Sequence, residues 1–192
     1  MTKRIALGLV LAALLGSSPL LVAETTYLPG AAELSGLQGA RFSSTLELAN
    51  PGDAAVTATV GLVPMAGMTT PAPVTRTLAA GESLRIEAAL KTLFGLAEGS
   101  AGTITVASET PLLASRTTRN VAAAEGPYGL GLGAVPEAEL LATGETGHSI
   151  WVSHSADPKT GYRTNLSVTL VDPGTVVVVR VLGPAHHHHA AE

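Results

Sequence analysis

The stretch LELANPGD at residues 46–53 runs from an alternating segment into a Pro-Gly turn, and VTLVDPGT at 168–175 resembles it 122 residues later. In residues 42–49 apolar and polar side chains alternate, which is the period of a half-buried strand. Asn50, Pro51 and Gly52 supply turn chemistry, and a second alternating run follows at 56–62. The pattern predicts two strands joined as a hairpin.

The same reasoning extends outward from this stretch. Strands are predicted at 74–78, from 83, at 102–108 and at 112–118, and the glycine-rich 126–136 is predicted to be a connection or an edge strand. Between them Ile86, Ala89, Leu90, Leu93 and Phe94 fall at helical spacing before Gly95, which indicates a short helix of about two or three turns. Short strands with frequent turn signals predict an all-β, antiparallel sandwich with one short helix.

The echo at 168–175 indicates an internal repeat. A first sandwich unit is expected over 24–133 and a partial second repeat over 134–184, followed by a disordered histidine-rich tail at 185–192. The second unit is too short to close a sandwich of its own. Its strands are therefore expected either to complete the first sandwich or to form a half domain.

The first 23 residues have the pattern of a secretory signal. Lys3 and Arg4 precede an apolar run, and small residues lead to Ala23, after which cleavage is expected. An uncleaved membrane anchor is the alternative, but Gly8, Gly16 and Pro19 interrupt the segment. The expected location is secreted or periplasmic, with possible association to the cell surface, and no membrane span remains after signal removal.

Composition narrows the function classes. Removal of 1–23 leaves 9 basic against 15 acidic residues, a formal charge of −6, and no basic stretch offers a site for nucleic acid. Charged residues are only 14% of the chain, which leaves few groups for acid-base chemistry. The chain has no cysteine, so disulfides, thiolate metal sites and a lipoprotein anchor are excluded.

Several segments together resemble the Ig-like repeat modules of large secreted bacterial proteins. They include YLPGAAELSGLQGARFSSTLELANPGDAAVTATV, LAAGESLRIEAALKTLFGL, TITVASETPLLASRTTRN and GPYGLGLGAVP. The resemblance implies an Ig-like β-sandwich that serves as a spacer or adhesive unit, mostly of unknown function, without catalytic residues. An aromatic-Arg-Thr-Asn-Leu stretch of such modules is present at 162–166, whereas the first unit reads FSSTL at 42–46 and lacks the arginine.

The sequence offers little for catalysis. GHSIW at 147–151 has a nucleophile-elbow serine, Ser149, but lacks the second glycine and the strand-turn-helix context. His148, His154 and Asp157 could share a metal, but two exposed histidines that flank a strand are the favoured interpretation. We expect no enzyme and no cofactor, because no nucleophile, base and orienting group stand at suitable spacing.

Two other features are candidates for binding. His186, His187, His188 and His189 could bind metal loosely in a flexible tail, or form a tail without function. Trp151 could present an indole to carbohydrate or a partner, or could cover the seam between the two units.

The valine run is the strongest candidate contact. Val176, Val177, Val178 and Val179 suit a strand that is covered on both faces, yet the short second unit has little to cover it. The run is expected to pair either with the first unit or with another chain. The sequence thus predicts an exported, noncatalytic structural or adhesive module that acts through protein contact or self-association at an edge strand. The alternative is an accessory module binding carbohydrate near Trp151 or metal at 186–189.

Overall fold

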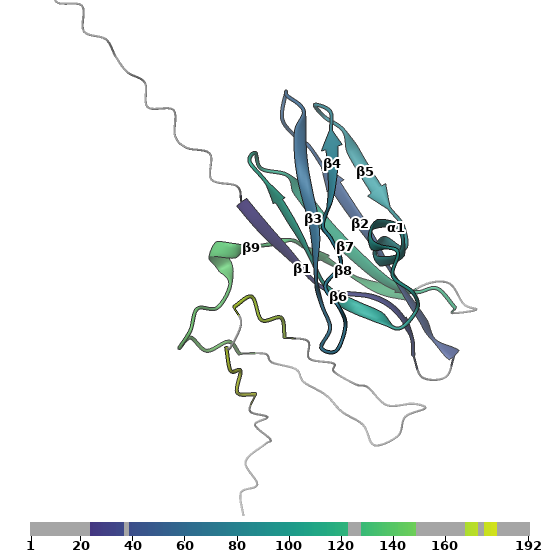
Figure 1. The fold of residues 1–192 in the computed structure, drawn as a ribbon. Helices are drawn as coiled ribbons and strands as arrows, with labels where there is room; N and C mark the ends of the chain where they lie inside the picture. The colour runs from purple at the N-terminus through teal and green to yellow at the C-terminus, as the bar shows by residue number, and fades with distance from the viewer. Residues whose placement is uncertain (1–23, 37–38, 123–127, 149–167, 173–174, 180–192) are drawn as a thin grey trace, which may run out of the picture.

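The computed structural model describes residues 24–36, 39–122, 128–148, 168–172 and 175–179. Within them the regular structure is mainly β, with one short α-helix (Figure 1). In order, the elements are β1 Glu24–Ser35, β2 Arg41–Ala49, β3 Val56–Pro64, β4 Val74–Leu78, β5 Ser83–Ile86, α1 Ala89–Phe94, β6 Ser100–Ser108, β7 Leu113–Asn120, β8 Tyr128–Gly133, β9 Val135–Pro136 and the 3-10 turn η2 Glu137–Glu139.

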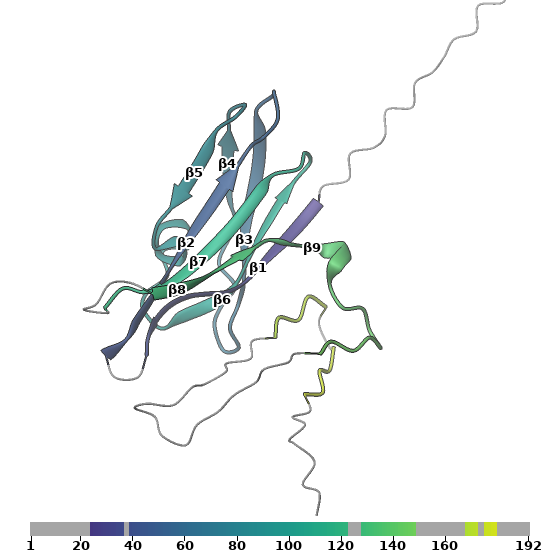
Figure 2. The same ribbon diagram turned by 180° about the vertical axis from the view of Figure 1, so that it is seen from behind.

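The nine strands form one antiparallel sheet that folds over itself into two layers. Strands β4-β3-β6-β1 make the first layer, and β5-β2-β7-β8 make the second. The layers are continuous where β1 pairs with β2 around Leu34 and Phe42. Figure 2 shows the second layer from its outer side. The antiparallel, mainly β sandwich with one short helix that the sequence predicts is therefore confirmed.

Inward-facing residues of both layers share one core. Because side chains alternate along a strand, every second residue of β3 is buried from Val56 to Leu62, and the apolar residues Leu46, Leu48, Ile104 and Val106 of β2 and β6 face the same core. The helix covers one end of this core with Ala89, Leu90 and Leu93. The strand members of the core are Leu28, Ala31, Leu46, Leu48, Ala58, Val60, Leu62, Leu78, Ile86, Ile104 and Val106. The described members of the core are therefore small and branched aliphatic side chains.

The predicted hairpin of 42–49 and 56–62 is wrong, although both strands exist. Strand β2 pairs with β5 and β7, whereas β3 pairs with β4 and β6. The Pro-Gly turn at 50–55 thus carries the chain from one layer to the other. The turn at 79–82 carries it back in the same way, because β4 and β5 also lie in different layers. Turn chemistry identifies a reversal of the chain but does not decide whether the flanking strands become neighbours.

Asn50 ties these two crossings together. Its side chain is 1% exposed. The Nδ2 amide donates to the carbonyl oxygens of Ala54 at 2.7 Å, Ala79 at 2.9 Å and Leu78 at 3.3 Å, and Oδ1 accepts from the Gly52 N–H at 3.0 Å. Its backbone N–H donates to the Glu82 carbonyl at 2.9 Å. One buried amide therefore satisfies backbone groups of both turns.

The predicted short helix is present, but it begins at Ala89, and Ile86 is the last residue of β5. Gly95 ends it in the left-handed region at φ 66° and donates its N–H to the Lys91 carbonyl at 2.9 Å. At the other end Thr92 Oγ1 donates to the Glu87 carbonyl at 2.7 Å.

The long first strand is not apparent from the sequence. Pro29 and Gly30 interrupt its alternation, and the register of β1 against β6 shifts between Leu28 and Ala31, as at a β-bulge. Gly30 lies at φ 74°, which the bulge requires and a larger residue rarely adopts. A bulge interrupts the alternation of buried and exposed side chains. Residues after the bulge face the opposite side from the one that uninterrupted alternation would predict.

Part of the region 134–184 lies against the outer face of the first layer. Strand β9 extends the edge of β1 by pairing Val135 with Tyr27. Thr169 Oγ1 hydrogen-bonds with Thr103 Oγ1 of β6. Thr103 and Tyr27 are buried although their neighbours Ile104 and Leu28 face the core, so something covers this outer surface. The covering segments include η2 and residues 168–172.

The second copy of the strand-turn motif is not built as predicted. Residues 168–172 and 175–179 are described and contain no strand. A strand persists only with a ladder partner, and these residues have none within the described ranges. Most of the remaining repeat, including 162–166, lies outside the described residues.

Candidate functional site

Strand β8 is an open edge of the second layer. It pairs with β7 from Asn120–Tyr128 to Ser115–Gly133. Among the described residues no strand pairs with its other side. All six of its residues are exposed. It is the strand that the sequence indicates as a glycine-rich connection or an edge, and the second of these alternatives is correct.

Glycines carry the free backbone groups of this edge. The Ala134 N–H donates to the Ala114 carbonyl at 3.0 Å, and the Val121 N–H donates to the Arg41 carbonyl at 2.7 Å. Hydrogen-bonded pairs alternate along an antiparallel ladder. When this alternation is continued along β7 and β8, the backbone N–H and C=O groups of Tyr128, Leu130 and Leu132 point toward β7. The N–H and C=O groups of the intervening Gly129, Gly131 and Gly133 therefore point to the open side.

The side chains of β8 divide sharply between its faces. Tyr128, Leu130 and Leu132 project from the face that continues the core side of β7, and they are 61%, 61% and 37% exposed. The opposite face carries only glycine. No charged residue occurs in the strand. A partner strand would find an apolar row to extend on one face and unhindered backbone at the edge.

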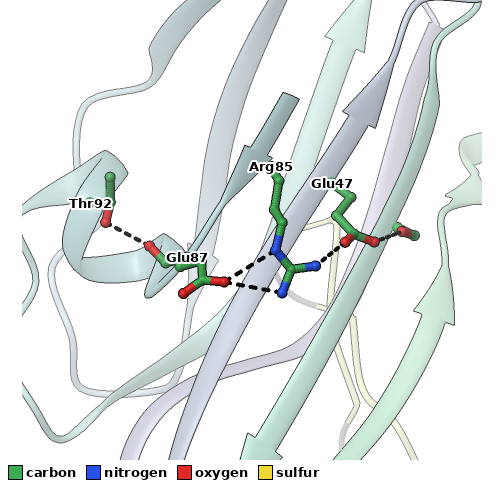
Figure 3. A network of polar contacts seen from close by, with 5 residues as sticks. Glu47, Arg85, Glu87 and Thr92 are labelled. Carbon is green, nitrogen blue, oxygen red and sulfur yellow. Dashed lines mark hydrogen bonds and ion pairs between the residues drawn. The ribbon is translucent and has the colours of Figure 1, made fainter. Parts of the chain in front are cut away.

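The edge at β5 is protected by charge. Arg85 pairs with Glu47 of β2 and with Glu87 before the helix, the latter at 3.2 Å (Figure 3). Ser115 of β7 donates to the second Glu47 oxygen at 3.2 Å. The hydrogen bond to Glu87, followed by the contacts with Glu47, raises the pKa of Arg85 above its ordinary value. The network borders a shallow groove on the outer face of β5, β2 and β7.

The edge at β4 is protected in another way. Arg76 lies opposite the core residue Ala58, on the inward side of this edge strand, and Nη1 donates to the Thr75 carbonyl at 2.8 Å. Inward-pointing charges and very short strands are devices that keep sheet edges from pairing with other chains. Strand β5 has four residues and a charge network, β4 has Arg76, and β8 has neither device.

Arg116 of β7, the strand that pairs with β8, is a buried cation. The residue is 2% exposed and pairs in register with Leu46 and Leu132. Its Nη1 donates to Thr118 Oγ1, whereas Nε has no hydrogen-bond partner. Burial lowers the pKa of Arg116, and no carboxylate contributes to it. The sequence does not single out this residue, because an arginine in an alternating strand is normally placed on the exposed face.

The predicted contact residues of the valine run are described and accessible. Val176, Val177, Val178 and Val179 are 84%, 46%, 72% and 55% exposed. They belong to no ladder. The structure thus presents two exposed apolar elements. They are β8, whose outer side has no described partner, and this run, and the sequence identifies only the second as a contact.

The other candidates are mostly outside the described residues. This holds for Trp151, for Ser149, His154 and Asp157, and for His186–His189. His148 is described and exposed. In the described ranges no three His, Asp or Glu side chains gather as metal ligands would. The helices described there include none with the length and hydropathy needed to cross a bilayer.

Comparisons with known proteins add a distant likeness of fold. No family model and no curated protein sequence matches the chain. Among solved structures, the crystal structure of Thermotoga maritima 1070 is similar at 16% identity and a TM-score of 0.45, covering 59% of this chain and 93% of that one. A likeness at this level carries no functional argument, so the candidate site rests on the geometry of the β8 edge.

Proposed function

We propose that the chain is an exported, noncatalytic structural or adhesive module that acts through protein contact, by pairing an extended segment of a partner with the open edge of β8. The single observation that supports this most strongly is the contrast between edges. Among the four outer strands that the structure describes, β4 carries Arg76, β5 is short and charged, and β9 has only two residues, while β8 has free glycine backbone, an apolar row and no charge.

The sequence supports export and the structural role. Residues 1–23 have the features of a secretory signal, and an acidic, cysteine-free chain with little charge resembles noncatalytic spacer modules. Strand addition suits such a module, since main-chain hydrogen bonds give affinity and side chains at alternate positions give specificity.

A proline at Gly131 tests the proposal with little disturbance of the fold. Proline removes the N–H that points to the open side and leaves the hydrogen bonds of β8 with β7 intact. A side chain at this position meets its nearest neighbour, Thr117 Oγ1, at an ordinary 3.5 Å. Gly131→Ala is the matched control, because it adds a Cβ and keeps the N–H.

The probe is a fluorescent eight-residue peptide of alternating valine and threonine. Its anisotropy is titrated with the chain from Glu24 onward and with the two variants. We expect Gly131→Pro to weaken binding at least tenfold and Gly131→Ala to change it less than twofold. Equal binding to the proline variant, or no binding of the peptide at millimolar protein, would refute pairing at β8.

A further inference from the structure

We infer that the strand accepted by β8 is the segment Thr175–Val179 of a second copy of this chain. The inference rests on the proposed function and names the partner. Each copy would then carry both an acceptor edge, β8, and a donor segment, Thr175–Val179. Copies would associate either by reciprocal pairing of two chains or by pairing from one chain to the next.

The two elements match in length and chemistry. Strand β8 has six residues and the donor segment five, and neither contains a charge. Valine has high β-propensity, and alternate valines would extend the apolar row of Tyr128, Leu130 and Leu132. The remaining valines would lie over the glycine face, which is open at Gly133 and has only ordinary contacts at Gly131. Both elements are exposed in the single chain, and pairing would remove both from water.

The position of the donor segment favours a second copy over its own edge. Residues 168–172 lie on the outer face of the first layer, where Thr169 bonds to Thr103. Burial, then Glu137 and then the Asp172 carboxylate raise the pKa of Tyr27 on the same face. Strand β8 belongs to the other layer, about 10 Å away. Both views place residues 168–172 on the side of the molecule where β9 and η2 lie (Figures 1 and 2).

The connection between residues 168–172, which lie on the first layer, and the donor segment is short. From Asp172 to Val176 four residues span at most about 14 Å when fully extended. Most of that reach would be used in passing from one layer to the other. Pairing Val176–Val179 with β8 of the same chain would therefore stretch the connection from residues 168–172 almost fully. A second copy can supply the strand without this stretching.

Complementation between two defective chains tests the inference. Gly131→Pro disables the acceptor edge and keeps the donor, whereas Val178→Lys disables the donor and keeps the acceptor. Met65→Lys is the control for adding a charge to an exposed apolar site, because Met65 is 48% exposed in the loop that follows β3. Mass is measured by light scattering over a hundredfold range of concentration.

We expect the unmodified chain and Met65→Lys to associate with rising concentration, and each defective chain alone to stay monomeric. An equimolar mixture of the two defective chains should reach the mass of a dimer and no more, because one intact interface remains. A Val178→Lys chain that associates like the unmodified chain would overturn the inference.

A chain that stays monomeric at every concentration would overturn it as well. Neither result would contradict binding of the valine-threonine peptide at β8. Failure of the inference and failure of the proposed function are therefore distinguishable.

Discussion

Asn50 is the side chain on which both interlayer crossings depend. Replacing it with alanine leaves the carbonyls of Ala54, Leu78 and Ala79 without this donor. A buried polar group without a partner costs about 1–3 kcal/mol. We expect Asn50→Ala to lower the free energy of unfolding by about 3 kcal/mol in urea titrations. Asp53→Ala, in the exposed part of the same turn, is the control, and a loss of similar size there would contradict the role of Asn50.

Arg116 is expected to oppose folding. Its guanidinium is buried and has no carboxylate partner among the described residues, and a desolvated charge without a partner is costly. Methionine has similar length and no charge. We expect Arg116→Met to raise the urea midpoint, by about 1 kcal/mol in the free energy of unfolding. Arg119→Met, on the other face of β7, should not do so. A destabilised Arg116→Met chain would mean that the hydrogen bond to Thr118 outweighs the cost of burial.

At the scale of elements, the glycines of β8 are not equivalent. A Cβ at Gly129 would overlap the Thr118 carbonyl and approach Arg119 Cα at 2.9 Å, whereas at Gly131 its contacts are ordinary. We expect Gly129→Ala to loosen β8 from β7, seen as faster amide hydrogen exchange at Leu130 and Leu132. Gly131→Ala should leave those rates unchanged. Equal rates in both variants would contradict the close approach of β8 to β7.

Alternation predicted which side chains of β2 and β3 face the core, but it could not predict their neighbours. A period of two assigns faces, and pairing depends on contacts between distant segments. The same limit explains why β1 was missed at its bulge and why the strands expected at 168–179 are absent from the described residues. For the site, the sequence indicated β8 as a possible edge, yet assigned the contact to the valine run. Exposure and the unprotected edge are properties of the folded sheet.

Across the whole molecule, Tyr27 connects the first strand with two later segments. Burial first, then the carboxylates of Glu137 and Asp172, raise the pKa of Tyr27. The folded chain therefore keeps this proton at a pH where the unfolded chain has lost it. We expect the free energy of unfolding to fall as the pH rises above about 10, the ordinary tyrosine value.

Urea titrations between pH 8 and 11 measure this decline. Tyr27→Phe should make it shallower, whereas Tyr128→Phe, on exposed β8, should leave it unchanged. An unaltered slope in Tyr27→Phe would show that other groups cause the alkaline loss.

The acidity of the chain gives the proposed self-association a definite salt dependence. The sequence carries a formal charge of −4, so two copies repel each other, while β8 and Thr175–Val179 contribute no charge to the contact. Salt screens the repulsion, with a Debye length of about 10 Å at 0.1 M and about 3 Å at 1 M. An uncharged strand-to-strand contact gains from this screening, whereas a contact built on ion pairs weakens. We expect association measured by light scattering to strengthen from 0.05 to 0.5 M sodium chloride, and weaker association at the higher salt would indicate a charged interface elsewhere on the surface.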